Sequence, residues 1–204
     1  MADPAVFFDK DGTLIRDVPY NVDPQRIILA PGAADSLRRL RHAGFRLVVV
    51  TNQSGVARGL FPEAALAAVR ARLEELLGLP LDGFNYCPHH PQGSRPEYAI
   101  ECSCRKPQPG LLLAAARDLS LNLAGSWMVG DILNDIEAGH RAGCRAILVD
   151  QGSETEWVPG PLRQPEAVVG TLAQAANLIL EHSASENTQK ASRSSYEQQF
   201  IELD

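Results

Sequence analysis

The sequence has no long hydrophobic run. Its first apolar stretch, Ala5–Phe8, is not preceded by a basic residue and is too short for the hydrophobic region of a signal peptide. The other apolar stretches are well below the roughly 20 residues that a membrane-spanning helix needs. We therefore expect a cytoplasmic protein that has no contact with a membrane.

The sequence also has no excess of basic residues. Its 19 lysines and arginines are outnumbered by 25 acidic residues, which gives a formal net charge of −6. A surface that binds nucleic acid needs clustered basic side chains, so we expect no nucleic-acid partner. Because no long apolar stripe is available for a subunit interface, we also expect a monomer.

Cysteine is scarce, and three of the four cysteines fall in one loop. Cys87 starts a Cys-x-His pattern, and after twelve residues Cys102 and Cys104 form Cys-x-Cys. Three thiolates and one imidazole make the closed tetrahedral set that is typical of structural zinc. The loop, residues 87–106, has little apolar material, so a metal would replace a hydrophobic core there. Cys144 lies alone and is expected to be a small buried hydrophobic residue.

Short apolar stretches alternate with helical patterns, which predicts an α/β fold with a mainly parallel sheet. The Val-rich run Phe45–Thr51 is typical of a strand buried on both faces. Further strands are predicted at Ala5–Asp9, Phe84–Tyr86, Ser126–Gly130 and Ala146–Val149. Helices are predicted from Pro31 to Gly44, from Pro62 to Gly78, and over Pro109–Leu119, Ile132–Arg141 and Leu172–His182.

The chain is predicted to form one domain, residues 1–182. The remainder, residues 183–204, is rich in Ser, Glu and Gln and has few apolar residues. Such a composition cannot bury enough apolar surface to form a core. We expect this segment to be a flexible polar tail.

The end of the first predicted strand carries two carboxylates, Asp9 and Asp11, followed by Gly12. Sites in open α/β sheets form at the carboxyl ends of strands. A carboxylate can attack phosphorus when a divalent cation neutralises the repulsion, and a second one can act as acid and base. An isolated Asp-Gly pair is equally typical of a simple turn, so the interpretation depends on further residues.

Those residues follow later strands. The hydroxyl of Thr51 can hydrogen-bond a phosphoryl oxygen, and the ammonium of Lys106 can offset its charge. The guanidinium of Arg105 can hold a second anionic group. Asp131 is a candidate metal ligand, and Asp135, four residues on along a helix, is its candidate orienting partner.

Together these residues resemble the four ordered motifs of the haloacid dehalogenase superfamily. The motifs are Asp9–Thr13, Thr51–Asn52, Lys106, and Gly130–Asp131 with Asp135, and they span residues 5–150. The resemblance implies a Rossmann-like three-layer sandwich without a large cap domain. The longer stretches Thr51–Gly59, Cys87–Gly93 and Cys102–Pro107 are similar to the D-glycero-D-manno-heptose 1,7-bisphosphate phosphatases.

This family resemblance implies a magnesium-dependent phosphatase that releases the C7 phosphate of a phosphorylated sugar during synthesis of the heptose precursor of lipopolysaccharide. It makes Asp9 the nucleophile and Asp11 the general acid and base, with Thr51 and Lys106 stabilising the phosphoryl group. It assigns Mg²⁺ to the side chains of Asp9 and Asp131 and to the backbone carbonyl of Asp11. It assigns Zn²⁺ to Cys87, His89, Cys102 and Cys104. Its substrate contacts correspond to Asp17, Tyr20, Asn52, Gln53, Ser54 and Arg105.

Between Asp17 and Tyr20 the sequence reads Val-Pro, where the family has His-Gly-type residues. Val18 and Pro19 are therefore not assigned as ligands.

Three other functions remain open from the sequence. A histidinol-phosphate phosphatase has the same motifs and a similar zinc loop. A phosphoryl-transfer mutase would need a helical cap to shield the aspartyl-phosphate from water, and no insertion is large enough. A non-enzymatic zinc module that binds nucleic acid is disfavoured by the negative charge.

Overall fold

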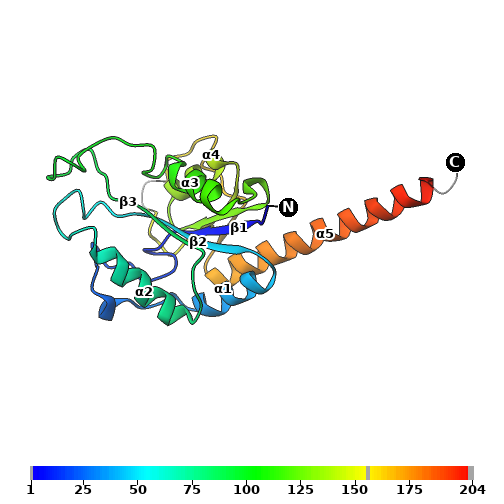
Figure 1. Cartoon of the computed structure of the whole chain (residues 1–204), viewed down its shortest axis with the longest axis horizontal. Coiled ribbons are helices and arrows are strands. Elements are labelled where there is room, and N and C mark those ends of the chain that lie inside the picture. Colours follow the sequence, from blue (N-terminus) through cyan, green and yellow to red (C-terminus); the bar gives the residue numbers. More distant parts are fainter. Residues whose placement is uncertain (1, 155–156, 202–204) are drawn as a thin grey trace.

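The computed structural model describes residues 2–154 and 157–201, and its centre is a parallel six-stranded sheet (Figure 1). The strand order is β3-β2-β1-β4-β5-β6, and every neighbouring pair is parallel. The strands are β1 (Ala5–Phe8), β2 (Arg46–Asn52), β3 (Gly83–Cys87), β4 (Trp127–Gly130), β5 (Arg145–Val149) and β6 (Ala167–Val169). The predicted α/β fold with a parallel sheet is confirmed.

Helices cover both faces of the sheet and complete three layers. One face carries α1 (Ala33–His42), α2 (Ala65–Leu77) and α5 (Leu172–Ile201), and the other carries α3 (Gly110–Leu119) and α4 (Leu133–Ala142). Two short 3-10 helices, η1 (Pro24–Arg26) and η2 (Leu123–Gly125), lie in connections. Among the described residues, β1 and β2 are joined through η1 and α1 only, as expected for a fold without a large cap.

The alternation of side chains along the strands explains why β1 and the middle of β2 are apolar on both faces. Val6 and Phe8 of β1 belong to the hydrophobic cluster beneath α1, α2 and α5, whereas Ala5 and Phe7 belong to the cluster beneath α3 and α4. Successive side chains of a strand point to opposite faces, so a strand covered on both sides must be continuously hydrophobic. The Val-rich run of β2 divides in the same way.

Two elements differ from the sequence prediction. The strand β6 was not predicted, because an apolar run of three residues, Ala-Val-Val, is too short to indicate a strand by itself. The last helix was predicted to end at His182, and this was wrong, since α5 continues to Ile201. Figure 1 shows this part of α5 projecting from the globular body. Helical bonding satisfies the backbone locally and needs no hydrophobic core, which is why polarity alone did not exclude a helix.

The flexibility of the polar tail stays a prediction, and its residues 202–204 lie outside the described part of the chain. In the described ranges, no helix has the length and apolar character needed to cross a membrane.

A chain that ends at Asn187 should fold and act like the full chain. Among the described side chains of α5, the buried ones are Leu172, Ala175, Ala176 and Ile179, and the ion pair between Arg145 and Glu186 at 2.6 Å is retained in this variant. Surface changes away from such features alter stability by about 0.5 kcal/mol or less. We therefore expect the melting temperature to change by about 2 °C or less. A loss of activity would contradict this.

Candidate active site

The predicted catalytic residues meet at the carboxyl ends of the three central strands. β1 lies between β2 and β4, and Asp9, Thr51 and Asp131 occur where these strands end. The backbone amide of Asp9 donates to the carbonyl of Val129 at 2.9 Å and thereby continues the β1–β4 pairing. The strands that follow β1 in the sequence lie first on one side of it, β2 and β3, and then on the other, β4, β5 and β6. Such a switch in direction leaves a crevice at the strand ends.

Three buried carboxylates gather in this crevice. Asp9, Asp131 and Asp135 each offer an oxygen atom, and these atoms lie within 4.8 Å of one another. The ammonium of Lys106 lies 2.5 Å from Asp9 and 2.7 Å from Asp135, and it donates to the carbonyl of Val50 at 2.8 Å. Asp135 was predicted to orient Asp131, and in the structure it forms an ion pair with Lys106. Asp135 therefore acts on the site by fixing the lysine.

Burial dominates the electrostatics of the cluster. It raises the pKa of Asp9 well above its ordinary value, and the Lys106 charge only partly offsets this. Burial also raises the pKa of Asp131 to about 6, with a further contribution from the charge of Asp135. Burial alone would lower the pKa of Lys106. The negative charges and hydrogen bonds of Asp135 and Asp9 have the larger effect, so the pKa of Lys106 lies above its usual range.

This charge balance fits a divalent cation. Three carboxylates face one ammonium, and oxygen ligands are those that Mg²⁺ prefers. A buried cluster with surplus negative charge is costly unless a cation neutralises it. The residues present therefore suit the metal implied by the sequence motifs.

Gly12 allows the backbone to approach Asp131. Its φ angle is +81°, which favours glycine, and an added Cβ would lie 2.0 Å from Oδ2 of Asp131. The neighbouring hydroxyl of Thr13 donates to Oδ1 of Asp131 at 3.3 Å. The turn after β1 therefore holds the carboxylate of Asp131, which directly follows β4.

Replacing Gly12 with alanine should reduce kcat at least about 100-fold, because the added methyl group displaces Asp131. Gly78 supplies a matched control, since its φ angle is +68° but an added Cβ would meet nothing within 4 Å. Gly78→Ala carries the same backbone strain and should keep full activity. Steady-state kinetics of both variants, with melting temperatures, check this. Equal activity losses in the two variants would contradict it.

The Asp11 side chain lies beside this cluster and faces a pocket of about 270 Å³. Its oxygen atoms accept hydrogen bonds from Lys10 at 2.5 Å and from Gln53 at 3.0 Å. Several of the predicted substrate residues line the same pocket, which is formed by Asp11, Asp17, Pro19, Tyr20, Asn21, Asn52, Gln53, Ser54 and Gly55. The structure thus brings together loops that are more than 30 residues apart in sequence.

Several of these side chains have partners within the protein. The amide group of Asn52 accepts from the backbone N–H of Lys106 at 3.0 Å and donates to its carbonyl at 3.1 Å. Gln53 also donates to the hydroxyl of Thr51 at 2.9 Å. Burial and the charge of Asp11 raise the pKa of Asp17, while Lys10 partly offsets them. Asn52 and Gln53 therefore position active-site groups as well as line the pocket.

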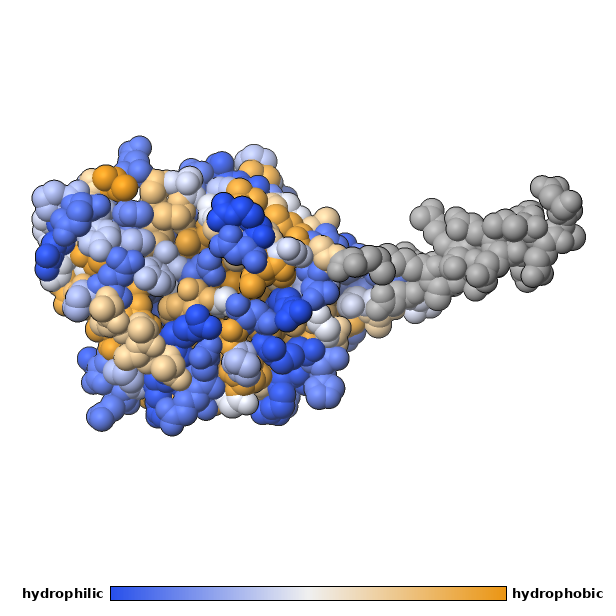
Figure 2. Space-filling view, in the orientation of Figure 1, coloured by the Kyte–Doolittle hydropathy of each residue, from blue (hydrophilic) through white to orange (hydrophobic). Residues whose placement is uncertain are grey.

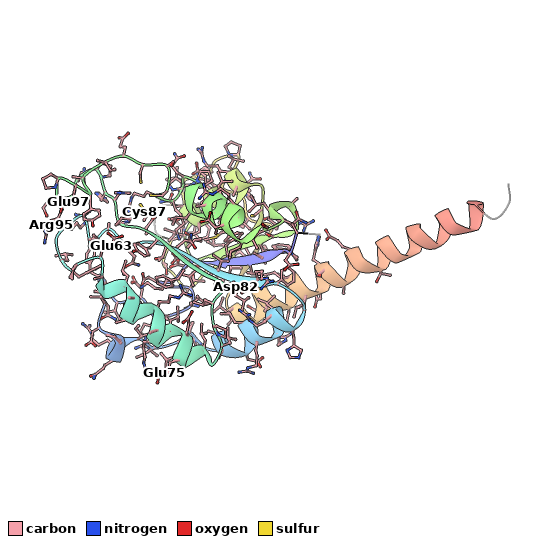
Figure 3. All side chains as sticks on the ribbon, viewed as in Figure 1. Glu63, Glu75, Asp82, Cys87, Arg95 and Glu97 are labelled. Carbon is pink, nitrogen blue, oxygen red and sulfur yellow. The ribbon has the colours of Figure 1, made fainter. Side chains whose placement is uncertain are left out.

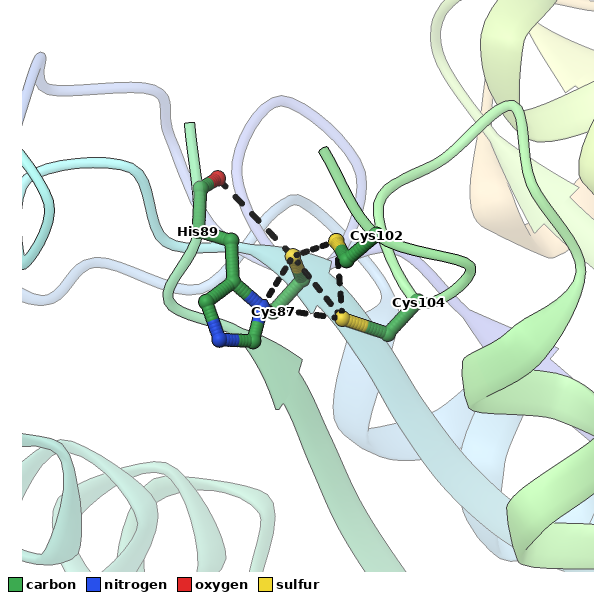
Figure 4. Close-up of side chains that lie close together, drawn as sticks. All are labelled: Cys87, His89, Cys102 and Cys104. Carbon is green, nitrogen blue, oxygen red and sulfur yellow. Dashed lines mark hydrogen bonds between the residues drawn. The ribbon is translucent and has the colours of Figure 1, made fainter. Parts of the chain in front are cut away.

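The predicted zinc ligands converge at the end of β3 (Figure 4). The sulfur atoms of Cys87, Cys102 and Cys104 lie 3.2–3.5 Å apart, and Nδ1 of His89 lies 3.3 Å from the sulfur of Cys104. A tetrahedron with Zn–S bonds of 2.3 Å has sulfur atoms about 3.8 Å apart, whereas a disulfide brings them to about 2.05 Å. The donor set therefore suits zinc. Figure 3 shows Cys87 at the strand end and Arg95 and Glu97 farther out on the loop.

Arg105 lies between the zinc ligands and Lys106, and its guanidinium donates to the carbonyl of His89 at 3.4 Å. Arg58 approaches the same region, with Nη2 3.2 Å from Nε2 of His90. The pKa of His90 is lowered by burial first and then by the charges of Arg105 and Arg58. This rim of the site is consequently positive, unlike the chain as a whole.

Three further residues, Lys10, Thr13 and Ser153, contact the site although the sequence patterns gave them no individual role. Lys10 and Thr13 lie within the first motif, but nothing in the sequence gave their side chains a partner. Ser153, which hydrogen-bonds Asp131, follows β5. The rule that sites form at strand ends could have identified it.

The fold and this set of carboxylates, ammonium and hydroxyl at the strand ends define a hydrolase of the haloacid dehalogenase type. In agreement, a family model described as HAD-hydrolase-like matches residues 103–175. The chain is 46% identical over 178 residues to the D-glycero-beta-D-manno-heptose-1,7-bisphosphate 7-phosphatase of Escherichia coli (strain K12), covering 81% of this chain and 93% of the relative. The chain belongs to the D-glycero-beta-D-manno-heptose-1,7-bisphosphate 7-phosphatase family.

Other comparisons agree. The relative of the same name from Photorhabdus laumondii is 39% identical over 180 residues, with coverage of 87% and 89%. Among solved structures, D,D-heptose 1,7-bisphosphate phosphatase from B. bronchiseptica, complexed with magnesium and phosphate, is 34% identical with a TM-score of 0.74. The match covers 88% of this chain and 99% of that one. A putative HAD-like phosphatase from Mesorhizobium loti is 38% identical with a TM-score of 0.77, with coverage of 90% and 87%.

Proposed function

We propose that the protein hydrolyses the C7 phosphate of D-glycero-D-manno-heptose 1,7-bisphosphate in the synthesis of the lipopolysaccharide heptose precursor. The observation that carries this is the Asp9 carboxylate, held 2.5 Å from Lys106 among buried carboxylates suited to a divalent cation. The relatives that are 46% and 39% identical to this chain bear the name of that reaction.

In the proposed mechanism, the carboxylate of Asp9 attacks phosphorus while the bond to the sugar oxygen breaks. Asp11 donates a proton to the leaving oxygen and then takes one from the water that hydrolyses the aspartyl-phosphate. Lys106 and the hydroxyl of Thr51 stabilise the charge on the transferring group. The rigid strand ends keep these groups in place without reorganisation.

Two metals complete the proposal. Asp9 and Asp131 would hold Mg²⁺ through their side chains, and Asp11 through its backbone carbonyl. Bound Mg²⁺ neutralises the repulsion between carboxylate and phosphate. Cys87, His89, Cys102 and Cys104 would hold a structural Zn²⁺, which fixes the loop that ends in Arg105 and Lys106.

The leaving sugar would occupy the 270 Å³ pocket beside Asp11. Asp17, Tyr20 and the stretch Asn52–Ser54 would contact its hydroxyl groups. Arg105 would bind the second phosphate, in keeping with the positive rim around His90.

We place the protein in the cytoplasm, where thiols stay reduced, and we propose a monomer. On the face drawn in Figure 2, hydrophilic and hydrophobic residues are interspersed over the body.

Phosphate release from the heptose bisphosphate and from histidinol phosphate, measured side by side with Mg²⁺, tests the function. We expect kcat/KM to favour the bisphosphate at least about 100-fold, since a second phosphate paired with arginine adds about 3 kcal/mol. Removal of Mg²⁺ by a chelator should abolish both activities, and added Mg²⁺ should restore them. Preference for histidinol phosphate would assign the alternative function, and turnover of neither would reject the proposal.

A further inference from the structure

Lys10 is buried to an unusual degree for a lysine. Its exposed fraction is 1%, and its ammonium lies 2.5 Å from Oδ1 of Asp11. A buried charge is costly unless it is paired and hydrogen-bonded. The ion pair with Asp11 therefore explains how the fold tolerates a buried lysine. The same ion pair fixes the position of Oδ1 of Asp11.

The other oxygen of Asp11 is fixed from a different strand. Nε2 of Gln53 donates to Oδ2 of Asp11 at 3.0 Å and also to the hydroxyl of Thr51 at 2.9 Å. Gln53 itself is buried, with 6% of its surface exposed. Asp11 thus has one partner on each carboxylate oxygen, one from the turn after β1 and one from the end of β2.

We infer that Lys10 and Gln53 form a clamp that holds the carboxylate of Asp11 in the orientation needed for proton transfer to the leaving group. This inference rests on the proposed function, in which Asp11 is the general acid and base. A side chain that must reach a leaving oxygen gains from fewer accessible rotamers, because misplacement by about 1 Å can cost 100-fold in rate.

Lys10 acts through Asp11 and not on the substrate. It is not among the residues that line the 270 Å³ pocket, and its ammonium is directed at Asp11. Lys10 is therefore a positioning residue. Its loss should affect the step in which Asp11 transfers a proton and should leave substrate affinity unchanged.

A double-mutant cycle with Lys10→Met and Asp11→Asn tests the clamp. Single-turnover rates and KM are measured on the heptose bisphosphate and on p-nitrophenyl phosphate. The leaving group of the second substrate needs no protonation. Lys10→Met should lower the rate on the sugar substrate at least about tenfold with KM unchanged, and the rate on the aryl substrate by no more than about threefold. In the Asp11→Asn background, Lys10→Met should have no further effect, because the two residues act as a unit.

Lys10→Arg keeps the charge and should restore the rate to within about threefold of the wild type. If Lys10→Met fails to fold, Lys10→Gln replaces it in the cycle, because it keeps a polar side chain without the charge, and it should show the same leaving-group dependence. Equal losses on both substrates, or an undiminished effect of Lys10→Met in Asp11→Asn, would overturn the clamp. Hydrolysis that survives in Asp9→Asn would instead reject the proposed function, so the two failures are distinguishable.

Discussion

Asp9→Asn should lower kcat for phosphate release at least about 10⁴-fold while the fold is retained. The carboxamide has nearly the shape of the carboxylate, but it is not a nucleophile and cannot form the acyl-phosphate. The substitution also removes one negative charge from a buried cluster whose burial raises the pKa of Asp9, so it leaves fewer charges to desolvate. Stopped assays of released phosphate measure the loss, and circular dichroism shows whether the fold is intact.

Asp118→Asn is the matched control. Asp118 lies at the exposed end of α3, where its partner is the equally exposed Arg117, and exposed pairs contribute little to stability. This variant should retain wild-type kinetics. Hydrolysis by Asp9→Asn within tenfold of the wild type would contradict the covalent mechanism.

Loss of a zinc ligand should affect substrate recognition more than phosphoryl transfer. Cys102→Ser removes one thiolate of the four-ligand set, so we expect bound zinc to fall from one equivalent to nearly none. The loop that carries Arg105 would then lose its cross-link, and kcat/KM for the heptose bisphosphate should fall at least about 100-fold, chiefly through KM. Lys106 should stay in place, because Asn52, Asp135 and Val50 hold it independently of the metal.

Cys144→Ala serves as the control for the zinc variant. Cys144 is buried just before the start of β5, whereas Cys87 lies at the end of β3, so the two lie at opposite ends of parallel strands. Its replacement should lower stability by about 1 kcal/mol and leave the zinc content unchanged. Metal analysis of both purified variants gives the comparison. Two outcomes would contradict the assigned role of the loop. One is a Cys102→Ser protein that keeps stoichiometric zinc, and the other is a decrease in kcat as large as the increase in KM.

The positions of the catalytic groups follow from the sequence because a parallel sheet imposes them. The middle of β2, Leu47–Val50, is buried and apolar because helices cover both faces of the sheet, so the polar pair Thr51–Asn52 marks the strand end. Parallel strands end on the same edge, and Asp9, Thr51 and Asp131 therefore converge although they are distant along the chain. The predicted zinc ligands could be chosen for a different reason, since a tetrahedral metal demands four donors, and the structure brings the donor atoms of Cys87, His89, Cys102 and Cys104 within 4.8 Å of one another.

Contacts between residues of different elements could not be predicted from the sequence. Nothing in the sequence indicated that Asn52 would bond both backbone groups of Lys106, or that Asp135 would pair with that lysine. These contacts form only because the packing of the helices and loops brings residues that are distant in the sequence within hydrogen-bonding distance, and no local sequence pattern indicates that packing. The helical continuation of α5 past His182 was also missed, since the prediction relied on hydrophobic periodicity, and this stretch contains few apolar residues.

In the proposed function, phosphoryl transfer and binding of the second phosphate depend on different parts of the molecule. Asp9, Asp131 and Lys106 are held by strand ends and by buried partners, whereas Arg105 belongs to a loop whose four donor atoms converge at its base. Sequence changes in that loop could therefore alter which second anionic group is bound without altering the groups proposed to cleave the phosphate ester.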